Sequence, residues 1–312
     1  MEKKQNYYKS KRLKELTFYI CILAVPVLQF AVFYIGVNFN SILMAFQSFE
    51  RDSETMVGSY EFLQGDIFAN FKLALWQLKN DTSLEYVLGN SLLAFIVTVG
   101  VGTTLALLFS LYIYKKMFLS KTFRLLLFAP SILSTIVTVL MYQNFVEIAL
   151  PEMIPSMNGI GLLSNMETAK FGLLFYSVWI GFGTQILMYS GAMNTIEESV
   201  VEAAKLDGAG PFREFVSIIF PLIYPTFVTF MITNIAGFFT NQLNLHVFYG
   251  NGAPDRFKTI GYYLYVQTLE GSGGSYATYP VLASYGLLFT LIAAPVTLLG
   301  RKFLEKIGPK TV

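Results

Sequence analysis

The residues of this sequence best suited to bind a ligand are hydroxyl and amide side chains within long apolar stretches. Asn234 and Asn241 are seven residues apart, so a continuous helix would carry both amides on one face. Two other stretches carry Ser131 with Thr135, and Ser177, Gly181 and Thr184 beside Trp179. Uncharged donors and acceptors near aromatic rings suit a neutral, hydroxyl-rich ligand such as a sugar. Each hydroxyl taken alone fits equally well a hydrogen bond to backbone within a helix bundle.

The sequence offers little for catalysis. Cys21 is the only cysteine and His246 the only histidine, and neither has a second ligand or a catalytic partner close in sequence. No glycine-rich loop ends in Gly-Lys-Ser or Gly-Lys-Thr, so we expect any ATP hydrolysis to belong to a partner protein. We therefore predict no enzyme activity, no metal and no bound cofactor for this chain, and no nucleic-acid partner.

The segments that must position the polar groups are long enough to cross a bilayer. Hydrophobic residues make up 54% of the 312 positions and charged residues 13%, about half the charged share of a soluble domain. A helix of about 20 apolar residues spans a bilayer core. Six runs without Asp, Glu, Lys or Arg meet that length. We predict an all-α membrane protein with one transmembrane domain, 16–300, and spans near 16–37, 86–114, 123–145, 171–192, 216–240 and 277–300.

The Lys and Arg residues predict the orientation. Sixteen of the 22 fall in the N-terminal tail 1–15, the second and fourth loops and the C-terminal tail 301–312. Short loops rich in Lys and Arg stay in the cytoplasm, so both termini are expected there and segment 52–81 outside. The first apolar run is too long for a cleaved signal peptide, so it is interpreted as a retained span. The basic loops are expected to contact anionic lipid.

The fourth loop, 194–215, has the pattern of a helix. Thr195 with Glu198 three residues later is a capping box, which predicts a helix beginning at Thr195. Asp207-Gly208 predicts its end, and Pro211 suits the first turn of the next helix. Helical spacing predicts an apolar face of Ile196, Val200, Ala203 and Ala204 and a polar face of Glu198, Glu202 and Lys205. Such a helix suits a groove on a protein partner; a helix lying on lipid is the alternative, although lipid-surface helices favour basic residues.

The run Glu202-Ala-Ala-Lys-Leu-Asp-Gly-Ala resembles the EAA loop of binding-protein-dependent ABC importer permeases, and Phe215, Ile218, Pro221 and Leu222 follow it as in that family. Over 171–254 the likeness narrows to carbohydrate permeases of the maltose type, through Asp207–Phe212, Trp179 with Gly181, and Asn251-Gly252 ahead of Pro254-Asp255-Arg256. Weaker similarity reaches Phe123-Arg124 and Pro130. The chain departs from the family in having Glu197 where relatives commonly have Pro, six spans rather than eight, and no large external insert.

This resemblance implies a type I importer permease fold in the cytoplasmic membrane of a prokaryote. It implies a heterodimer with a second permease, an ABC ATPase dimer that holds ATP and Mg, and an extracytoplasmic solute-binding protein that delivers a sugar or oligosaccharide. The residues that it assigns to ATPase coupling are Glu202, Ala203, Ala204, Asp207 and Gly208. Those that it assigns to the sugar are Ser131, Thr135, Ser177, Gly181, Thr184, Asn234, Phe238 and Asn241. Ser131 stands where the family has an aromatic residue, so the sugar need not be maltose.

Two other functions remain open from the sequence. An ABC permease for a non-sugar solute would share the EAA loop, although a polyamine path would need acidic residues within the spans. A secondary carrier that works without ATP would be expected to carry a charged residue inside a span. The six apolar runs contain no acidic residue and no Lys or Arg, so neither alternative has this support.

Overall fold

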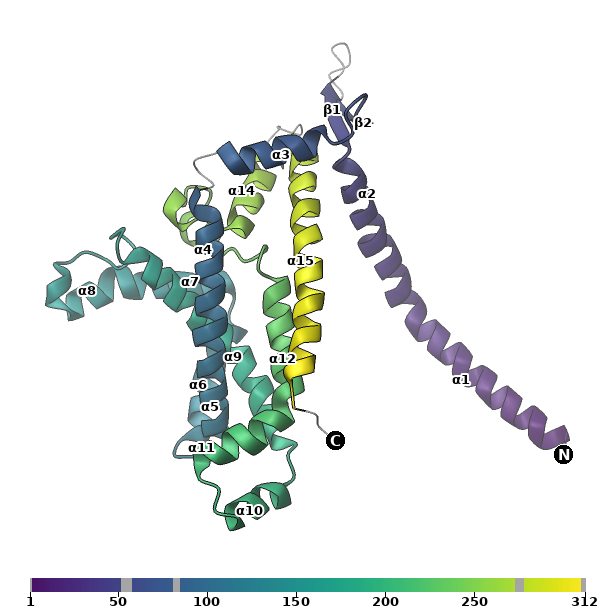
Figure 1. The fold of residues 1–312 in the computed structure, drawn as a ribbon, viewed down its shortest axis with the longest axis vertical. Helices are drawn as coiled ribbons and strands as arrows, with labels where there is room; N and C mark the ends of the chain where they lie inside the picture. Colours follow the sequence, from purple (N-terminus) through teal and green to yellow (C-terminus); the bar gives the residue numbers. More distant parts are fainter. Residues whose placement is uncertain (1, 52–57, 81–84, 273–277, 310–312) are drawn as a thin grey trace. The chain divides into compact units, whose positions relative to one another are not determined.

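The computed structural model describes residues 2–51, 58–80, 85–272 and 278–309, and these are mostly helical, as the sequence predicts (Figure 1). Within these described residues, five helices are long and apolar enough to cross a membrane, and a bent pair of helices is the sixth candidate. The chain divides into two compact units. Unit 1 comprises 1–77 and 270–288, and unit 2 comprises 78–269 and 289–312.

Unit 1 begins with a long helix. Helix α1 (Glu2–Gln29) continues through a π-helical segment, η1 (Phe30–Gly36), into α2 (Val37–Met44). The basic segment expected as a tail therefore has helical backbone from Glu2. The helix also extends past the predicted end of the span at 37, and there Asn38 and Ser41 donate side-chain hydrogen bonds to carbonyls four residues earlier, which satisfies these polar groups within the helix.

A small cap follows in unit 1, and it adds a β-hairpin to the predicted all-α fold. Strands β1 (Gln47–Arg51) and β2 (Gly58–Phe62) pair antiparallel, and α3 (Ala69–Asn80) follows them. The buried Asn70 amide donates to the carbonyls of Ala45 and Gln47, at 3.0 and 2.8 Å, and so holds α3 against the start of β1. A hydrogen bond from Lys72 holds the pKa of Asp66 below its usual range. Residues 52–57 and 81 of the predicted external segment lie outside the described part.

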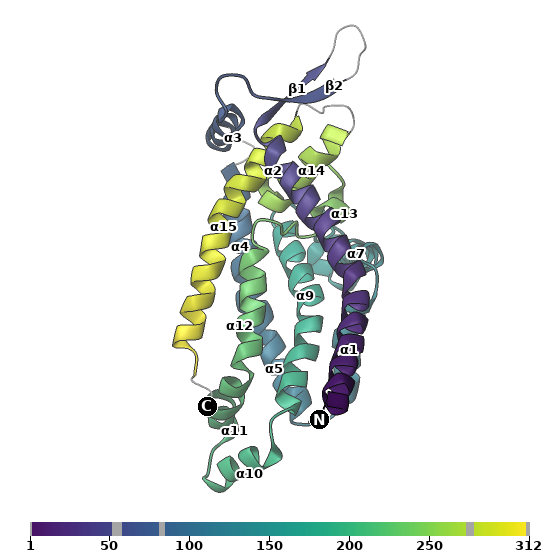
Figure 2. The ribbon, with the colours of Figure 1, turned by 90° about the vertical axis from the view of Figure 1, so that its right-hand side faces the viewer.

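Unit 2 contains the other helices. They are α4 (Glu85–Ile96), η3 (Val97–Gly102), α5 (Thr103–Tyr114), α6 (Ser120–Ile132), α7 (Thr135–Asn144), η4 (Phe145–Ala149), α8 (Leu150–Met153), η5 (Pro155–Met157), α9 (Ala169–Asn194), α10 (Glu198–Leu206), α11 (Pro211–Glu214), η6 (Phe215–Ile219), α12 (Phe220–Ala236), α13 (Leu245–Tyr249), η7 (Asp255–Phe257), α14 (Ile260–Ser272) and α15 (Tyr279–Ile307), with α14 and α15 ending and beginning in unit 1. Figure 2 shows α9 and α12 running side by side. The candidate spans here are 86–114, 169–194, 211–236 and 279–307.

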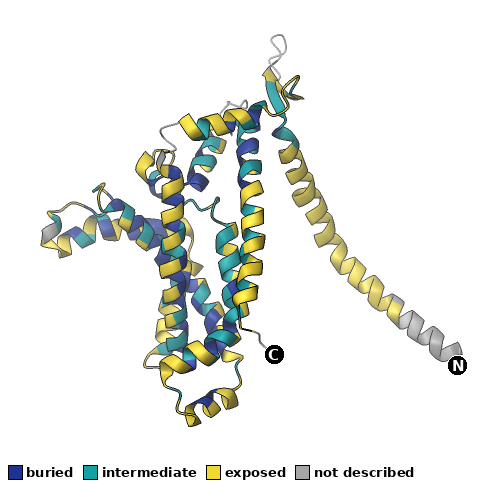
Figure 3. Ribbon diagram, in the orientation of Figure 1, coloured by how far each residue is buried: buried dark blue, intermediate teal, exposed yellow. Residues whose placement is uncertain are grey.

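Helix α9 is the centre of unit 2. It contacts α5, α6, η3 and α12, and its side chains Ile186, Tyr189 and Met193 are fully buried. Gly183 lets α6 approach, since a Cβ there would lie 2.7 Å from the carbonyl oxygen of Leu127. Figure 3 shows this buried stripe on α9, while α4 carries exposed residues along its length. Exposed apolar side chains on the outer helices are expected where lipid or another subunit covers them.

The third predicted span, 123–145, is broken. Helices α6 and α7 meet at 109°, with Leu133 and Ser134 in extended conformation between them. Pro130 lies in the last turn of α6, where it removes a backbone donor, and Ser134 caps α7 by accepting from the Val137 N–H. Figure 1 shows α7 and α8 turned away from the line of α6. The predicted span 123–145 is therefore two helices joined at a bend, although the apolar run in its sequence continues through the bend.

Candidate functional site

The helix in the fourth loop is present as α10, but it does not begin as predicted. Thr195 ends α9 instead, and its Oγ1 donates to the Ala192 carbonyl at 2.8 Å. The N-cap of α10 is Glu197, in extended conformation and without a side-chain capping bond. The capping-box prediction is therefore wrong, because the Thr195 hydroxyl is used by the preceding helix.

The end of α10 is confirmed. Gly208 has φ +77°, and its N–H donates to the Lys205 carbonyl, while the Ala209 N–H reaches the Ala204 carbonyl. This is the left-handed ending that glycine adopts most easily. Pro211 then occupies the first turn of α11, also as predicted.

The buried face of α10 differs from the predicted one. Val201 and Ala204 are buried, whereas Val200 and Ala203 are exposed. Three exposed apolar residues recur every three positions along α10: Val200, Ala203 and Leu206. Leu206 is 88% exposed. Phe212, just beyond the turn, is 80% exposed, and Glu202 also faces solvent. Figures 1 and 2 place α10 beyond the ends of α9 and α11, so this face is open to a partner.

A cavity of about 290 Å³ lies between α10 and the end of α5. Both charge signs line it, from Lys115, Lys116 and Lys205 and from Glu198 and Glu202. The acidic residues predicted for one side of this helix, Glu198 and Glu202, therefore line a cavity that also contains lysine side chains.

An ion pair that sequence reasoning missed joins two elements beside this cavity. Lys115, the C-cap of α5, pairs with Glu214, the last residue of α11. The Glu214 side chain is only 3% exposed and that of Lys115 is half-buried. The two lie 99 residues apart, so no local pattern reveals their contact. The pair ties α11, which follows α10, to the end of the second span.

The predicted sugar residues of the third span do not share a helix. Ser131 lies in the last turn of α6 and bonds to the Phe128 carbonyl at 2.7 Å, while Thr135 begins α7. The break between the two helices removes the predicted four-residue spacing on one face. Ser131 does lie beside α9, because a Cβ built at Gly183 would be 3.6 Å from its Oγ.

The polar residues of the fourth span lie on the single helix α9, as predicted. The Ser177 hydroxyl is buried without a hydrogen-bond partner among the described residues, whereas Gly181 and Thr184 are exposed. Gln185, which sequence reasoning missed, has a buried side-chain oxygen that is likewise unpartnered in the described chain. Its position inside an apolar run was the signal that could have identified it.

The predicted pair in the fifth span is separated. Helix α12 ends at Ala236, so Asn234 lies on the helix and Asn241 lies beyond it, and the expected shared face does not exist. The Asn234 side-chain nitrogen is buried and unpartnered among the described residues. Asn241 instead orders its own turn by accepting from the Leu243 N–H at 3.0 Å. Phe238 packs edge-on against Phe95, with ring centroids 5.7 Å apart.

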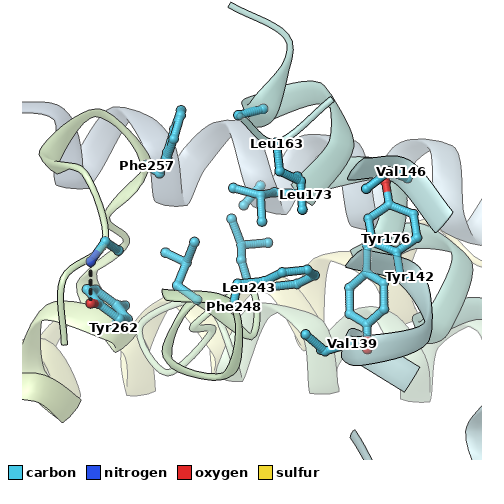
Figure 4. Close-up of a cluster of buried hydrophobic side chains, with 14 of the residues drawn as sticks. Val139, Tyr142, Val146, Leu163, Leu173, Tyr176, Leu243, Phe248, Phe257 and Tyr262 are labelled. Carbon is cyan, nitrogen blue, oxygen red and sulfur yellow. Dashed lines mark hydrogen bonds between the residues drawn. The ribbon is translucent and has the colours of Figure 1, made fainter. Parts of the chain in front are cut away.

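The segment after α12 is fastened to the second span and to α14. The buried Asn90 amide donates to the carbonyls of Arg256 and Lys258, both at 2.9 Å, and Ser91 accepts the Ile260 N–H. The Tyr262 hydroxyl accepts the Ala253 N–H at 3.0 Å, drawn as a dashed line in Figure 4. No local sequence pattern marks Asn90 or Ser91 for this role, because their partners lie more than 160 residues away.

An aromatic core stands beside this segment. Figure 4 shows Tyr142, Tyr176 and Phe248 together, and the ring centroids of Tyr176 and Phe248 are 5.0 Å apart. The Tyr142 hydroxyl donates to the Gly172 carbonyl, and Tyr176 shares a hydrogen bond with Thr138. These bonds satisfy the polar tips of the buried Tyr142 and Tyr176 rings.

Comparison with known proteins agrees with this architecture. The family model described as "Binding-protein-dependent transport system inner membrane component" matches residues 98–311. The Maltose/maltodextrin transport system permease protein MalF of Klebsiella aerogenes is 30% identical over 221 residues, which cover 65% of this chain and 41% of that protein. The MalF protein of Escherichia coli strain K12 is 29% identical over the same shares. This chain thus matches about two fifths of the length of these curated relatives.

Two solved structures share the fold. One is a bacterial ABC transporter involved in the import of the acidic polysaccharide alginate, with a TM-score of 0.73 at 16% identity, covering 95% of this chain and 98% of that one. The other is a bacterial alginate ABC transporter in complex with a pentasaccharide-bound periplasmic protein, with a TM-score of 0.74 at 18% identity, covering 97% and 99%. The fold is that of a type I importer permease. Since the family model matches well over half of its residues, this chain belongs to the family of inner membrane components of binding-protein-dependent transport systems.

Proposed function

We propose that this chain is one of two permease subunits of an ATP-binding-cassette importer that moves a sugar or oligosaccharide across the membrane. A second permease completes the path, an ATPase dimer binds and hydrolyses ATP with Mg, and an extracytoplasmic binding protein delivers the ligand. Both termini and α10 lie on the cytoplasmic side, in line with the distribution of Lys and Arg. The matched MalF proteins are named for maltose and maltodextrin transport, and the structural neighbours for alginate import.

The observation that carries this proposal is the open face of α10. A nine-residue helix ends at a glycine with positive φ and presents Val200, Ala203 and Leu206 outward, although in an isolated chain such apolar groups would gain from burial. Glu202 stands beside them and can meet a basic group of the ATPase. Coupling is thus assigned to Glu202, Ala203, Ala204, Asp207 and Gly208.

The path for the ligand is proposed along α9 and α12. Unpartnered buried polar atoms at Ser177, Gln185 and Asn234 are costly unless a state of the transport cycle uses them. A sugar hydroxyl supplies both a donor and an acceptor, which suits the Ser177 hydroxyl and the Asn234 amide. Ser131, Thr135, Gly181, Thr184, Phe238 and Asn241 remain in the proposed set, with Asn241 shaping the loop at the end of α12.

Uptake into proteoliposomes tests the proposal. The chain is reconstituted with its neighbouring permease, ATPase and binding protein, and accumulation of labelled oligosaccharides is measured after each component is omitted in turn. We expect accumulation only with all four proteins and ATP, and none from the chain alone. Asn234→Ala should weaken the apparent binding of the oligosaccharide, as measured from the concentration dependence of uptake, by about 1 to 3 kcal/mol. Asn144→Ala, an exposed amide bonded only within its helix, is the control.

Two results would overturn the proposal. Accumulation that persists without ATP or without the ATPase would indicate a secondary carrier. ATP-dependent accumulation of a peptide or amino acid, with no response to any oligosaccharide, would retain the importer and reject the sugar.

A further inference from the structure

We propose that the turn between α5 and α6 forms a binding site for the headgroup of an anionic phospholipid. The site is independent of which solute crosses the membrane. It is built from four features: a cavity, a cluster of basic residues, a turn held in an unusual conformation, and exposed apolar side chains next to it.

The cavity has a volume of about 550 Å³ and lies where the turn meets the ends of α6 and α9. Its lining includes Lys116, Lys121 and Arg124, together with the polar side chains of Ser120, Thr122 and Asn194. Within the described parts of the chain, none of the three basic groups forms an ion pair with a carboxylate. The neighbouring Lys115 differs, because Glu214 already neutralises it. Lys116 also lines the neighbouring cavity that contains Glu198 and Glu202, so Lys121 and Arg124 are the two cations that do not share that acidic lining, and they favour an anion here.

The turn is held in a conformation that presents these groups. Lys116 and Leu119 have φ of 50° and 55°, in the left-handed region that residues with a Cβ rarely adopt. The Tyr112 hydroxyl donates to the Phe118 carbonyl at 2.6 Å, and the Ser120 N–H to the Met117 carbonyl at 3.0 Å. Backbone strain that surrounding bonds maintain is more typical of functional segments than of plain connections.

The apolar surroundings identify the source of the anion as a lipid. Phe118 is 81% exposed, and Met117 and Leu119 beside it are also exposed. Leu125 and Leu126 continue this surface along the first turns of α6. The turn follows directly after the candidate span 86–114, so basic groups at headgroup level adjoin side chains that can enter the acyl boundary. A soluble phosphate would leave these apolar groups in water.

Native mass spectrometry of the full-length chain in mild detergent tests the site. Phosphatidylglycerol and phosphatidylcholine with the same acyl chains are titrated separately, and lipid-bound and free chain are counted. The variant Lys121→Gln/Arg124→Gln is compared with Lys302→Gln/Lys306→Gln, which removes two exposed charges from the last turns of α15. We expect the first variant to lose about tenfold or more in affinity for phosphatidylglycerol, and the second to match the wild type. Phosphatidylcholine should bind all three proteins equally.

A second variant and a soluble phosphate compound separate binding of the lipid from binding of its phosphate group alone. Phe118→Ser leaves the basic cluster intact and should weaken binding of phosphatidylglycerol but not of glycerol phosphate. Equal loss in the two double variants would indicate general charge attraction and contradict the site. So would glycerol phosphate or inorganic phosphate that binds as tightly as the lipid. A Lys121→Gln/Arg124→Gln protein that keeps the lipid but no longer retains an associated protein subunit would assign the surface to that subunit instead.

Discussion

At the scale of single residues, contacts that hold both ends of unit 2 together come from side chains far apart in sequence. Glu214 and Lys115 form an ion pair that is mostly removed from solvent, and Asn90 satisfies two carbonyls of a segment more than 160 residues later. Polar residues inside apolar runs can be recognised from the sequence, but their distant partners cannot. A charged residue at the edge of a run, such as Glu214, looked like any solvated loop residue.

The Lys115–Glu214 pair should be essential to the local structure. Removing one member leaves the other charge poorly solvated, which typically costs about 3 to 5 kcal/mol for a buried pair and less when one partner, here Lys115, is partly exposed. We expect Glu214→Gln and Lys115→Gln each to lower the thermal midpoint of the purified chain, and the double variant to fall by less than the sum. Lys72→Gln and Asp66→Asn, an exposed pair, form the control cycle. Additive losses at Lys115 and Glu214 would show that the contact contributes no coupling.

At the scale of elements, the proposed docking of α10 depends on the shape of its C-terminal end as well as on its exposed surface. Gly208 ends the helix at φ +77°, and a Cβ at this position would meet no atom within 4 Å. Any effect of a substitution there arises from the backbone and not from a steric clash. Gly210, two residues later, also has open space around it but an ordinary φ of −68°.

This contrast gives a matched test. Gly208→Ala should cost about 1 kcal/mol and displace the turn, so uptake and ATPase association should fall while membrane insertion stays normal. Gly210→Ala should leave both near wild type. The measurements are ATPase co-purification and uptake in proteoliposomes. If the two variants behave alike, the left-handed turn is not what positions α10.

Sequence reasoning located the elements better than their ends and faces. The apolar runs predicted the helices because length and lack of charge are sufficient for that. The bend after Ile132 and the end of α12 at Ala236 were missed, since residues that follow remain apolar or weakly polar and periodicity continues through them. The Thr195 capping box failed because the preceding helix competes for the same hydroxyl. Faces inferred by continuing a helix past such points were consequently wrong.

At the scale of the whole molecule, the account requires one orientation in the membrane. The distribution of Lys and Arg predicts that α10 and both termini lie inside and the β-hairpin outside. Single cysteines at Ser59 and at Lys306, in a Cys21→Ala background, test it with a membrane-impermeant thiol reagent. In intact cells we expect labelling at the Ser59 position only, and labelling at both after permeabilisation. Labelling at the Lys306 position alone in intact cells would invert the topology.

The central claim is that α10 docks to an ATPase and transmits its cycle to the spans. Glu202 is exposed on that helix, and a charge reversal there should oppose a basic group of the partner, at a cost of about 2 kcal/mol or more. Glu152→Lys makes the same charge change at an exposed residue of α8, which controls for net charge.

The most direct measurement is ATP hydrolysis stimulated by ligand-loaded binding protein, recorded with uptake in the same proteoliposomes. We expect Glu202→Lys to abolish both while the chain inserts at normal levels, and Glu152→Lys to retain both. A Glu202→Lys chain that still holds the ATPase and transports at the wild-type rate would contradict the docking role of α10.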